Sequence, residues 1–158
     1  MGAAQLRHPS PNLTRVRRSR PGKARSRALA IYAWPVPGDA ERQPEDLFDG
    51  YPRALMICRQ VEHAVCAIGE ATVTVAKSQV AFRRRTGFAY VWRPGQYIDS
   101  DVPAVLSIAL PYEARSDRFK EVVHPSRDVW MHHIELHEAS QIDDEVREWL
   151  AEAYASAG

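Results

Sequence analysis

Histidines are concentrated in the stretch Trp130–His137, which reads WMHHIELH. If this stretch is a β-strand, its period of two places three potential metal ligands on one face: His133, Glu135 and His137. Imidazole and carboxylate groups bind metals and transfer protons near neutral pH. The three positions span about 13 Å, so at most two neighbouring side chains could bind one ion. A metal site would therefore need another ligand, such as His124 or Asp128.

A structural role is the interpretation that we favour for these histidines. The same period turns His132 toward the core, where a hydrogen bond to the backbone would satisfy it, and leaves the other polar side chains at the surface. The sequence contains no G-x-S-x-G, paired-cysteine or phosphate-binding glycine motif. We therefore predict no catalytic residue, metal or cofactor. The rival hypothesis is an enzyme or metal-binding protein that uses His132 or His133.

A second group of candidate residues lies in the stretch Lys77–Pro94, which reads KSQVAFRRRTGFAYVWRP. Apolar residues alternate on both sides of Thr86-Gly87, which predicts two β-strands joined by a tight turn. Arginines at such a turn and aromatic rings on the strands can hold phosphates and stack on bases. In the alternative interpretation the arginines keep the turn soluble and the aromatic rings line the core.

The alternation changes phase just before this hairpin. Val73 and Val75 are expected to point inward, yet Val80 and Phe82 have the opposite parity. A β-bulge at residues 77–79 would reconcile the two phases and re-aim polar side chains, and so would a simple loop between two strands. The candidate ligand-binding residues are the polar residues that interrupt the apolar pattern, together with two aromatic residues near them: Lys77, Ser78, Gln79, Arg83, Arg84, Arg85, Trp92, Lys120, Trp130, His132 and His133.

Two helices are predicted to cover the sheet. The segment Pro44–Gly69 has one apolar face, made of Leu55, Cys58, Val61, Val65 and Ile68. The last helix is predicted to begin at a capping box of Ser140 and Asp143. Its apolar face consists of Ile142, Val146, Trp149, Leu150, Ala153 and Tyr154. If Trp149 is fully buried, its replacement with alanine should cost about 3 to 5 kcal/mol.

The remaining strands are predicted at Thr72–Lys77, Ala104–Leu110, Lys120–His124 and Trp130–His137. The second of these is almost continuously apolar, which is typical of a central strand. The order of helix, strands and helix predicts an α+β fold with a mostly antiparallel sheet of four to six strands. Both helices are expected on one face of that sheet. A ligand or partner would then use the other face.

Charge is distributed unevenly along the 158 residues. Residues 1–38 contain eight Lys or Arg and no acid, and we predict a disordered basic tail. Residues 39–158 carry 13 basic and 20 acidic residues and are predicted to form a single α+β domain. The tail is either an arm that holds phosphate backbones or a solvated leader.

The two cysteines indicate a reducing compartment. Cys58 and Cys66 fall in one predicted helix, about 12 Å apart, whereas disulfide Cα atoms must lie within about 7 Å. No run approaches the 18 apolar residues of a membrane span, and the short apolar run Ala28–Trp34 is a poor signal peptide. We therefore predict a cytoplasmic protein without membrane contact.

Four segments carry a family resemblance: KSQVAFRRRTGFAYVWRP, VLSIALP, FKEVVHPSRDVWMHHIEL and DDEVREWLAEAY. Together they resemble the bacterial domain of unknown function (DUF) 5655 family over roughly residues 48–157. The resemblance implies an architecture and no catalytic motif. We predict a non-catalytic binding or interaction module for an anionic ligand, either a nucleic acid or a small anion. A structural dimer formed through an exposed strand edge is the further alternative.

Overall fold

The computed structural model describes residues 42–158. The predicted disordered tail of residues 1–38 lies outside this range. The elements in chain order are α2 (Pro44–Leu47), α3 (Pro52–Ile68), β1 (Thr72–Val75), β2 (Gln79–Arg83), β3 (Gly87–Trp92), η1 (Pro94–Gln96), β4 (Ala104–Leu110), β5 (Phe119–Ser126), β6 (Val129–Leu136), η2 (Ala139–Gln141) and α4 (Asp144–Ser156).

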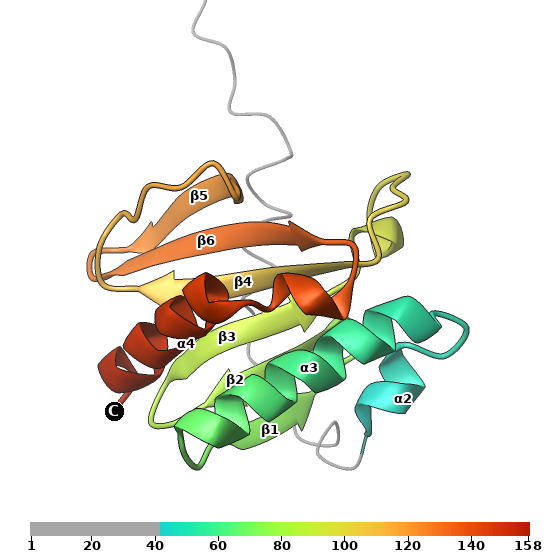
Figure 1. Cartoon of the computed structure of the whole chain (residues 1–158), viewed down its shortest axis with the longest axis horizontal. Helices are drawn as coiled ribbons and strands as arrows, with labels where there is room; N and C mark the ends of the chain where they lie inside the picture. The colour runs from blue at the N-terminus through green and yellow to red at the C-terminus, as the bar shows by residue number, and fades with distance from the viewer. Residues whose placement is uncertain (1–41) are drawn as a thin grey trace, which may run out of the picture.

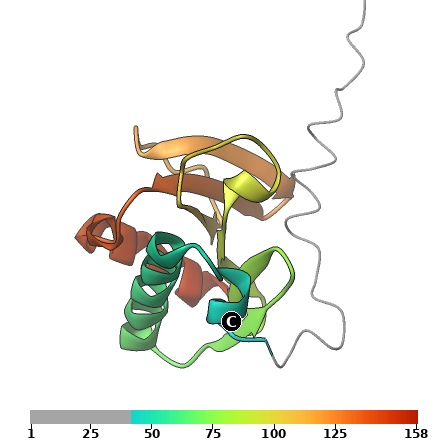
Figure 2. The ribbon, with the colours of Figure 1, turned by 90° about the vertical axis from the view of Figure 1, so that its right-hand side faces the viewer.

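All six strands form one antiparallel sheet in the order β1-β2-β3-β4-β6-β5. Helices α3 and α4 contact each other and lie on the same face of this sheet (Figures 1 and 2). The predicted α+β fold, with two terminal helices on one face of an antiparallel sheet, is therefore confirmed. Within residues 42–158, no helix is both long and apolar enough to cross a membrane.

Helix α3 forms where the sequence predicts a helix. Proline is tolerated at its first position because the N–H that proline lacks would have no partner there. Its buried face includes Cys58, Val61 and Val65 and packs on the sheet within the central hydrophobic cluster. The helix ends at Gly69, whose backbone N–H still donates to the carbonyl of Val65.

Helix α4 begins differently from the prediction. Asp143 is the N-cap residue, and its side chain accepts a hydrogen bond from the backbone N–H of Val146 at 3.2 Å. Ser140 lies instead in the short helix η2, so the predicted capping box is wrong. An aspartate satisfies the same free N–H groups and adds a negative charge at the positive end of the helix dipole.

Trp149 is only half-buried, and its ring lies 4.5 Å from the ring of Phe119. The condition of complete burial is not met, because α4 reaches the sheet near its β5 edge at this point. We therefore expect Trp149→Ala to cost less than the range for a fully buried tryptophan.

The change of phase before the hairpin comes from a turn. Val75 pairs with Val80, and the backbone N–H of Ala76 donates to the carbonyl of Gln79 at 2.9 Å. Residues 77–78 therefore form a two-residue loop, so of the two alternatives the simple loop is confirmed and the bulge is not. The register shift lies instead at Phe82/Arg83, beside the next turn. Val73, expected to point inward, is 37% exposed because β1 is the edge strand.

The other strands match the predictions to within two residues at each end. Strand β4 has the predicted bounds, and both of its faces are buried, as expected for a central strand. Strands β5 and β6 are longer than predicted at their shared turn, where the loop shrinks to Arg127 and Asp128. Pro125 is accommodated in β5 because that strand is at an edge of the sheet.

Candidate functional site

The predicted ligand residues do not form one surface. Strand β2 separates the turn at residues 77–78 from the turn at Arg84 and Arg85, and its five residues span about 16 Å. His132 lies on the helix-covered side of β6, whereas its neighbour His133 lies on the other side. The structure therefore distributes the candidates among three places. These are the face of the sheet opposite α3 and α4, which we call the open face, the β5 edge, and the tip of the β2–β3 hairpin.

On the open face, a chain of hydrogen bonds links three strands. The indole N–H of Trp92 donates to Ser107 Oγ at 2.8 Å, and Ser107 Oγ lies 2.7 Å from Nδ1 of His133. Because an indole can only donate, the serine proton is directed to His133. Burial, and secondarily the neighbouring His132, lowers the pKa of His133 to about 4. His133 is therefore a neutral acceptor, and it is buried rather than at the surface as predicted.

Ser107 is the residue that sequence reasoning missed. Its only signal was that it is the one polar residue in an otherwise apolar strand. A serine beside a histidine base resembles a catalytic pair, but Ser107 is completely buried. Gln79 shares this face and is also buried, and its side-chain oxygen has no hydrogen-bond partner. This arrangement links strands β3, β4 and β6 and offers a substrate no access to the hydroxyl.

His132 is held by two backbone groups. Its Nδ1 lies 3.1 Å from the carbonyl of Trp130, and its Nε2 lies 2.9 Å from the backbone N–H of Ala114. Nδ1 therefore carries the proton and Nε2 accepts. Burial lowers its pKa as well. The interpretation of His132 as a core residue bonded to the backbone is confirmed, and residues 42–158 contain no cluster of three potential metal ligands.

At the β5 edge, the two candidates have partners within the domain. Lys120 Nζ lies 3.8 Å from Glu135 Oε1. The ring of Trp130 stacks on that of His124 with their centroids 3.9 Å apart. Both interactions are near the surface, where an ion pair contributes little to stability. We assign no ligand to this edge.

The third place is a groove of about 990 Å³ at the hairpin tip. It lies between the ends of α3 and α4 and the start of β1, and we call it the arginine groove. Its polar and aromatic lining consists of Cys66, Glu70, Thr72, Arg83, Arg84, Arg85 and Tyr154. Of the predicted ligand residues, the structure brings only the three arginines together here.

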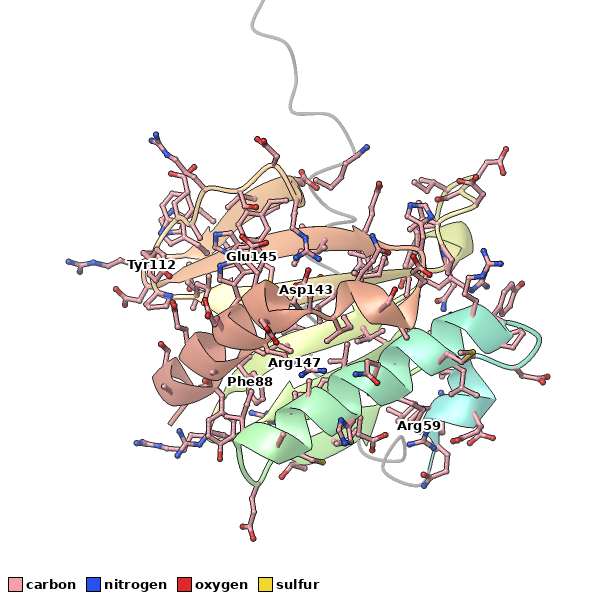
Figure 3. All side chains as sticks on the ribbon, viewed as in Figure 1. Arg59, Phe88, Tyr112, Asp143, Glu145 and Arg147 are labelled. Atoms are coloured by element: carbon pink, nitrogen blue, oxygen red, sulfur yellow. The ribbon has the colours of Figure 1, made fainter. Side chains whose placement is uncertain are left out.

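Tyr154 is fixed in the arginine groove by close packing. Its hydroxyl donates to the carbonyl of Glu70 at 3.1 Å, and its ring packs edge-to-face with the ring of Phe88 at a centroid distance of 5.5 Å. Phe88 is labelled in Figure 3. A Cβ atom on Gly69 would collide with the Tyr154 hydroxyl. The absence of a side chain at position 69 therefore lets the end of α4 approach the end of α3.

The arginines differ in what they do. The guanidinium of Arg84 donates to the carbonyl of Tyr154 at 3.0 Å and stacks over the Tyr154 ring at 4.3 Å. The backbone N–H groups of Arg85 and Thr86 both donate to the carbonyl of Ala157. The hairpin thus caps the carbonyl end of α4, where positive charge is favourable. The side chain of Arg85 is exposed, and within residues 42–158 no carboxylate pairs with it.

The fold and the groove define a small α+β domain with a ligand-sized basic depression at one end. Residues 45–157 match the family model described as domain of unknown function (DUF5655), and the chain belongs to this family. The resemblance inferred over residues 48–157 is therefore confirmed. No curated protein matches the chain, and no solved structure matches it either.

Proposed function

We propose that this domain is a non-catalytic binding module for an anionic ligand and that the arginine groove is its binding site. The observation that carries this proposal is the exposed guanidinium of Arg85, which lies beside Arg84 with no carboxylate partner in the described part of the chain. By contrast, Arg59 pairs with Glu45 and Glu62 on the surface of the helices. An unpaired guanidinium in a groove is available for a phosphate or a carboxylate.

The dimensions of the groove support a ligand of intermediate size. Its volume is at the upper end of the range of about 300 to 1,000 Å³ for small-molecule sites. The indole of Trp92 is bonded edge-on to Ser107, which disfavours base stacking at that position. We therefore expect phosphate contacts, which depend on salt and not on base sequence.

The test measures fluorescence anisotropy of labelled single- and double-stranded oligonucleotides with the full chain at two salt concentrations. Arg85→Ala should weaken binding about tenfold at low salt, because one charge-assisted contact contributes about 1.4 kcal/mol. Arg127→Ala is the matched control: it removes the same charge from the exposed β5–β6 turn. Arg84 is unsuitable because it caps α4.

Equal binding by Arg85→Ala, Arg127→Ala and the unchanged chain would contradict the proposal for nucleic acid. The basic residues 1–38 contribute equally in all three proteins, so binding by the tail alone gives that result. Competition by ATP or pyrophosphate, lost in Arg85→Ala, would identify a small anion as the ligand. An effect of Arg85→Ala on either probe supports the arginine groove.

We also propose a cytoplasmic location. Cys58 and Cys66 both carry free thiols, and Cys66 is exposed. Free exposed thiols persist in reducing compartments. Cell fractionation with a tagged full-length chain tests this location.

A further inference from the structure

We propose that the outer edge of β1 binds an extended peptide as an additional strand, with the acidic C-terminal end of that peptide in the arginine groove. This inference rests on the proposed anion site and names a peptide as its ligand. It is carried by three features of the molecule: the direction of the backbone groups of β1, the composition of that strand, and the position of the groove at one end of it.

The backbone groups of β1 alternate between its neighbour and solvent. Ala76 donates to Gln79 across the β1–β2 ladder, so the groups of Ala76, Thr74 and Thr72 point toward β2. The N–H and C=O groups of Val73 and Val75 therefore point away from the sheet. Strand β1 pairs with β2 alone among the described strands, so these groups form an open edge.

The β1 edge also lacks the features that normally prevent strand addition. Its sequence TVTV has no charge, no proline and no bulge, and Val73 is 37% exposed. The opposite edge, β5, contains Lys120, Glu121 and Pro125 and two register shifts. Proteins use such charges, prolines and irregularities to block edge pairing. One edge of this sheet is blocked in this way, and the other is open.

The arginine groove lies at the N-terminal end of β1. Thr72 lines the groove and pairs in register with Arg83 on β2. A peptide that runs antiparallel to β1 therefore has its C-terminal end beside the arginines, within reach of Arg85. A terminal carboxylate or a C-terminal acidic side chain would be bound there.

The same geometry disfavours a second copy of this chain as the occupant. In an antiparallel pair of β1 strands, the residues that follow β1 in one copy approach the groove of the other. Those residues include Lys77, an exposed cation that would lie near Arg85. An acidic peptide end meets attraction at this point, whereas a second β1 strand meets repulsion.

The test uses the full chain and fluorescein-labelled peptides. Two of them are TVTVEE with a free C-terminus and TVTVKK with a C-terminal amide. Two further TVTVEE peptides are N-methylated, each at one of the two sets of alternate residues. We expect TVTVEE to bind and the TVTVKK amide to bind at least tenfold more weakly. N-methylation on one of the two alternating sets should abolish binding, because only one set of N–H groups bonds β1. Val73→Pro should weaken binding of TVTVEE at least tenfold, because it removes an outward N–H and leaves the bonds to β2 in place.

Equal binding of methylated and unmethylated peptides, or no binding of TVTVEE, would overturn the strand-addition proposal. The N-methylated peptides keep the test valid if Val73→Pro does not fold. Oligonucleotide or ATP binding that depends on Arg85, without peptide binding, means that only the edge proposal fails. If neither peptide binding nor Arg85-dependent binding of oligonucleotides or ATP is found, the proposed anion site fails as well. Sedimentation that shows a dimer abolished by Val73→Pro would overturn the peptide in favour of a second copy.

Discussion

Replacing Phe88 with alanine is expected to lower the free energy of unfolding by about 3 to 5 kcal/mol. The Phe88 side chain is 1% exposed and belongs to the cluster that joins the sheet to both long helices. Its ring also meets the ring of Tyr154 in α4. Removing it leaves a cavity at the point where the hairpin and α4 meet. For a domain whose stability is about 5 to 15 kcal/mol, this is a large fraction of the total.

Equilibrium urea unfolding, followed by tryptophan fluorescence, measures this loss. Phe88→Leu is the control, because it keeps a large apolar side chain and leaves a smaller cavity, so it should cost clearly less than Phe88→Ala. A loss below about 1 kcal/mol in Phe88→Ala would contradict the assigned packing. Because Phe88 contacts Tyr154, the alanine variant should also bind oligonucleotides more weakly under conditions in which it remains folded.

His133 alone is expected to contribute about 3 kcal/mol to the free energy of unfolding at neutral pH, and most of this contribution should be lost when the pH is lowered from 7 to 4.5. Burial lowers the pKa of His133 from 6.5 to about 4 in the folded domain. Between these values the unfolded chain binds the proton more strongly than the folded one. The contribution of His133 to the free energy of unfolding is therefore complete above pH 6.5 and is lost as the pH falls toward 4. Protonation also places a proton on Nδ1, the atom that accepts the hydrogen bond from Ser107 when the ring is neutral.

The charged and polar groups around His133 come from both neighbouring strands. Glu121 on β5 and Ser107 on β4 are its register partners, and His132 precedes it on β6. His132 also has a lowered pKa, and its protonation adds to the same loss of stability. The lowered pKa of Asp143, caused mainly by its hydrogen bond to Arg118, contributes only at still lower pH. The window between pH 7 and 4.5 therefore reports mainly on these two histidines.

Urea unfolding at four pH values between 7 and 4.5 tests this expectation. His133→Gln keeps a side chain that can accept from Ser107 and does not titrate, so its stability should vary much less with pH. His124→Gln, at an exposed position on β5, should keep the pH dependence of the unchanged protein. If His133→Gln and the unchanged chain lose stability in parallel, the acid sensitivity has another source.

Local patterns predicted the elements well. The alternation around Thr86-Gly87 specified the hairpin, and the apolar run at residues 104–110 specified a central strand. The spacing of apolar residues by three and four positions specified α3. These signals are local because helix and strand periods depend on neighbouring residues alone. The start of α4 was missed because Ser140 and Asp143 both suit an N-cap, and only the backbone conformation distinguishes them.

The candidate site was predicted only in part. The three arginines were chosen because they crowd a hairpin tip, and they do line the groove together. The other candidates lie elsewhere: at the turn of residues 77–78, on the face of the sheet that carries Trp92, and at the β5 edge. A period of two assigns each side chain to a face, but it does not say how far apart two residues on that face lie.

By itself, the sequence determined the family, the hairpin, the two helices and the alternation of buried and exposed positions. Only the tertiary structure decided which distant residues meet. Arg84 reaches the carbonyl of Tyr154, 70 residues away, and Ser107 reaches His133 across two paired strands. The physical reason is that strand order and the docking of α4 depend on packing over the whole core, so the partners of a polar side chain follow from the assembled sheet.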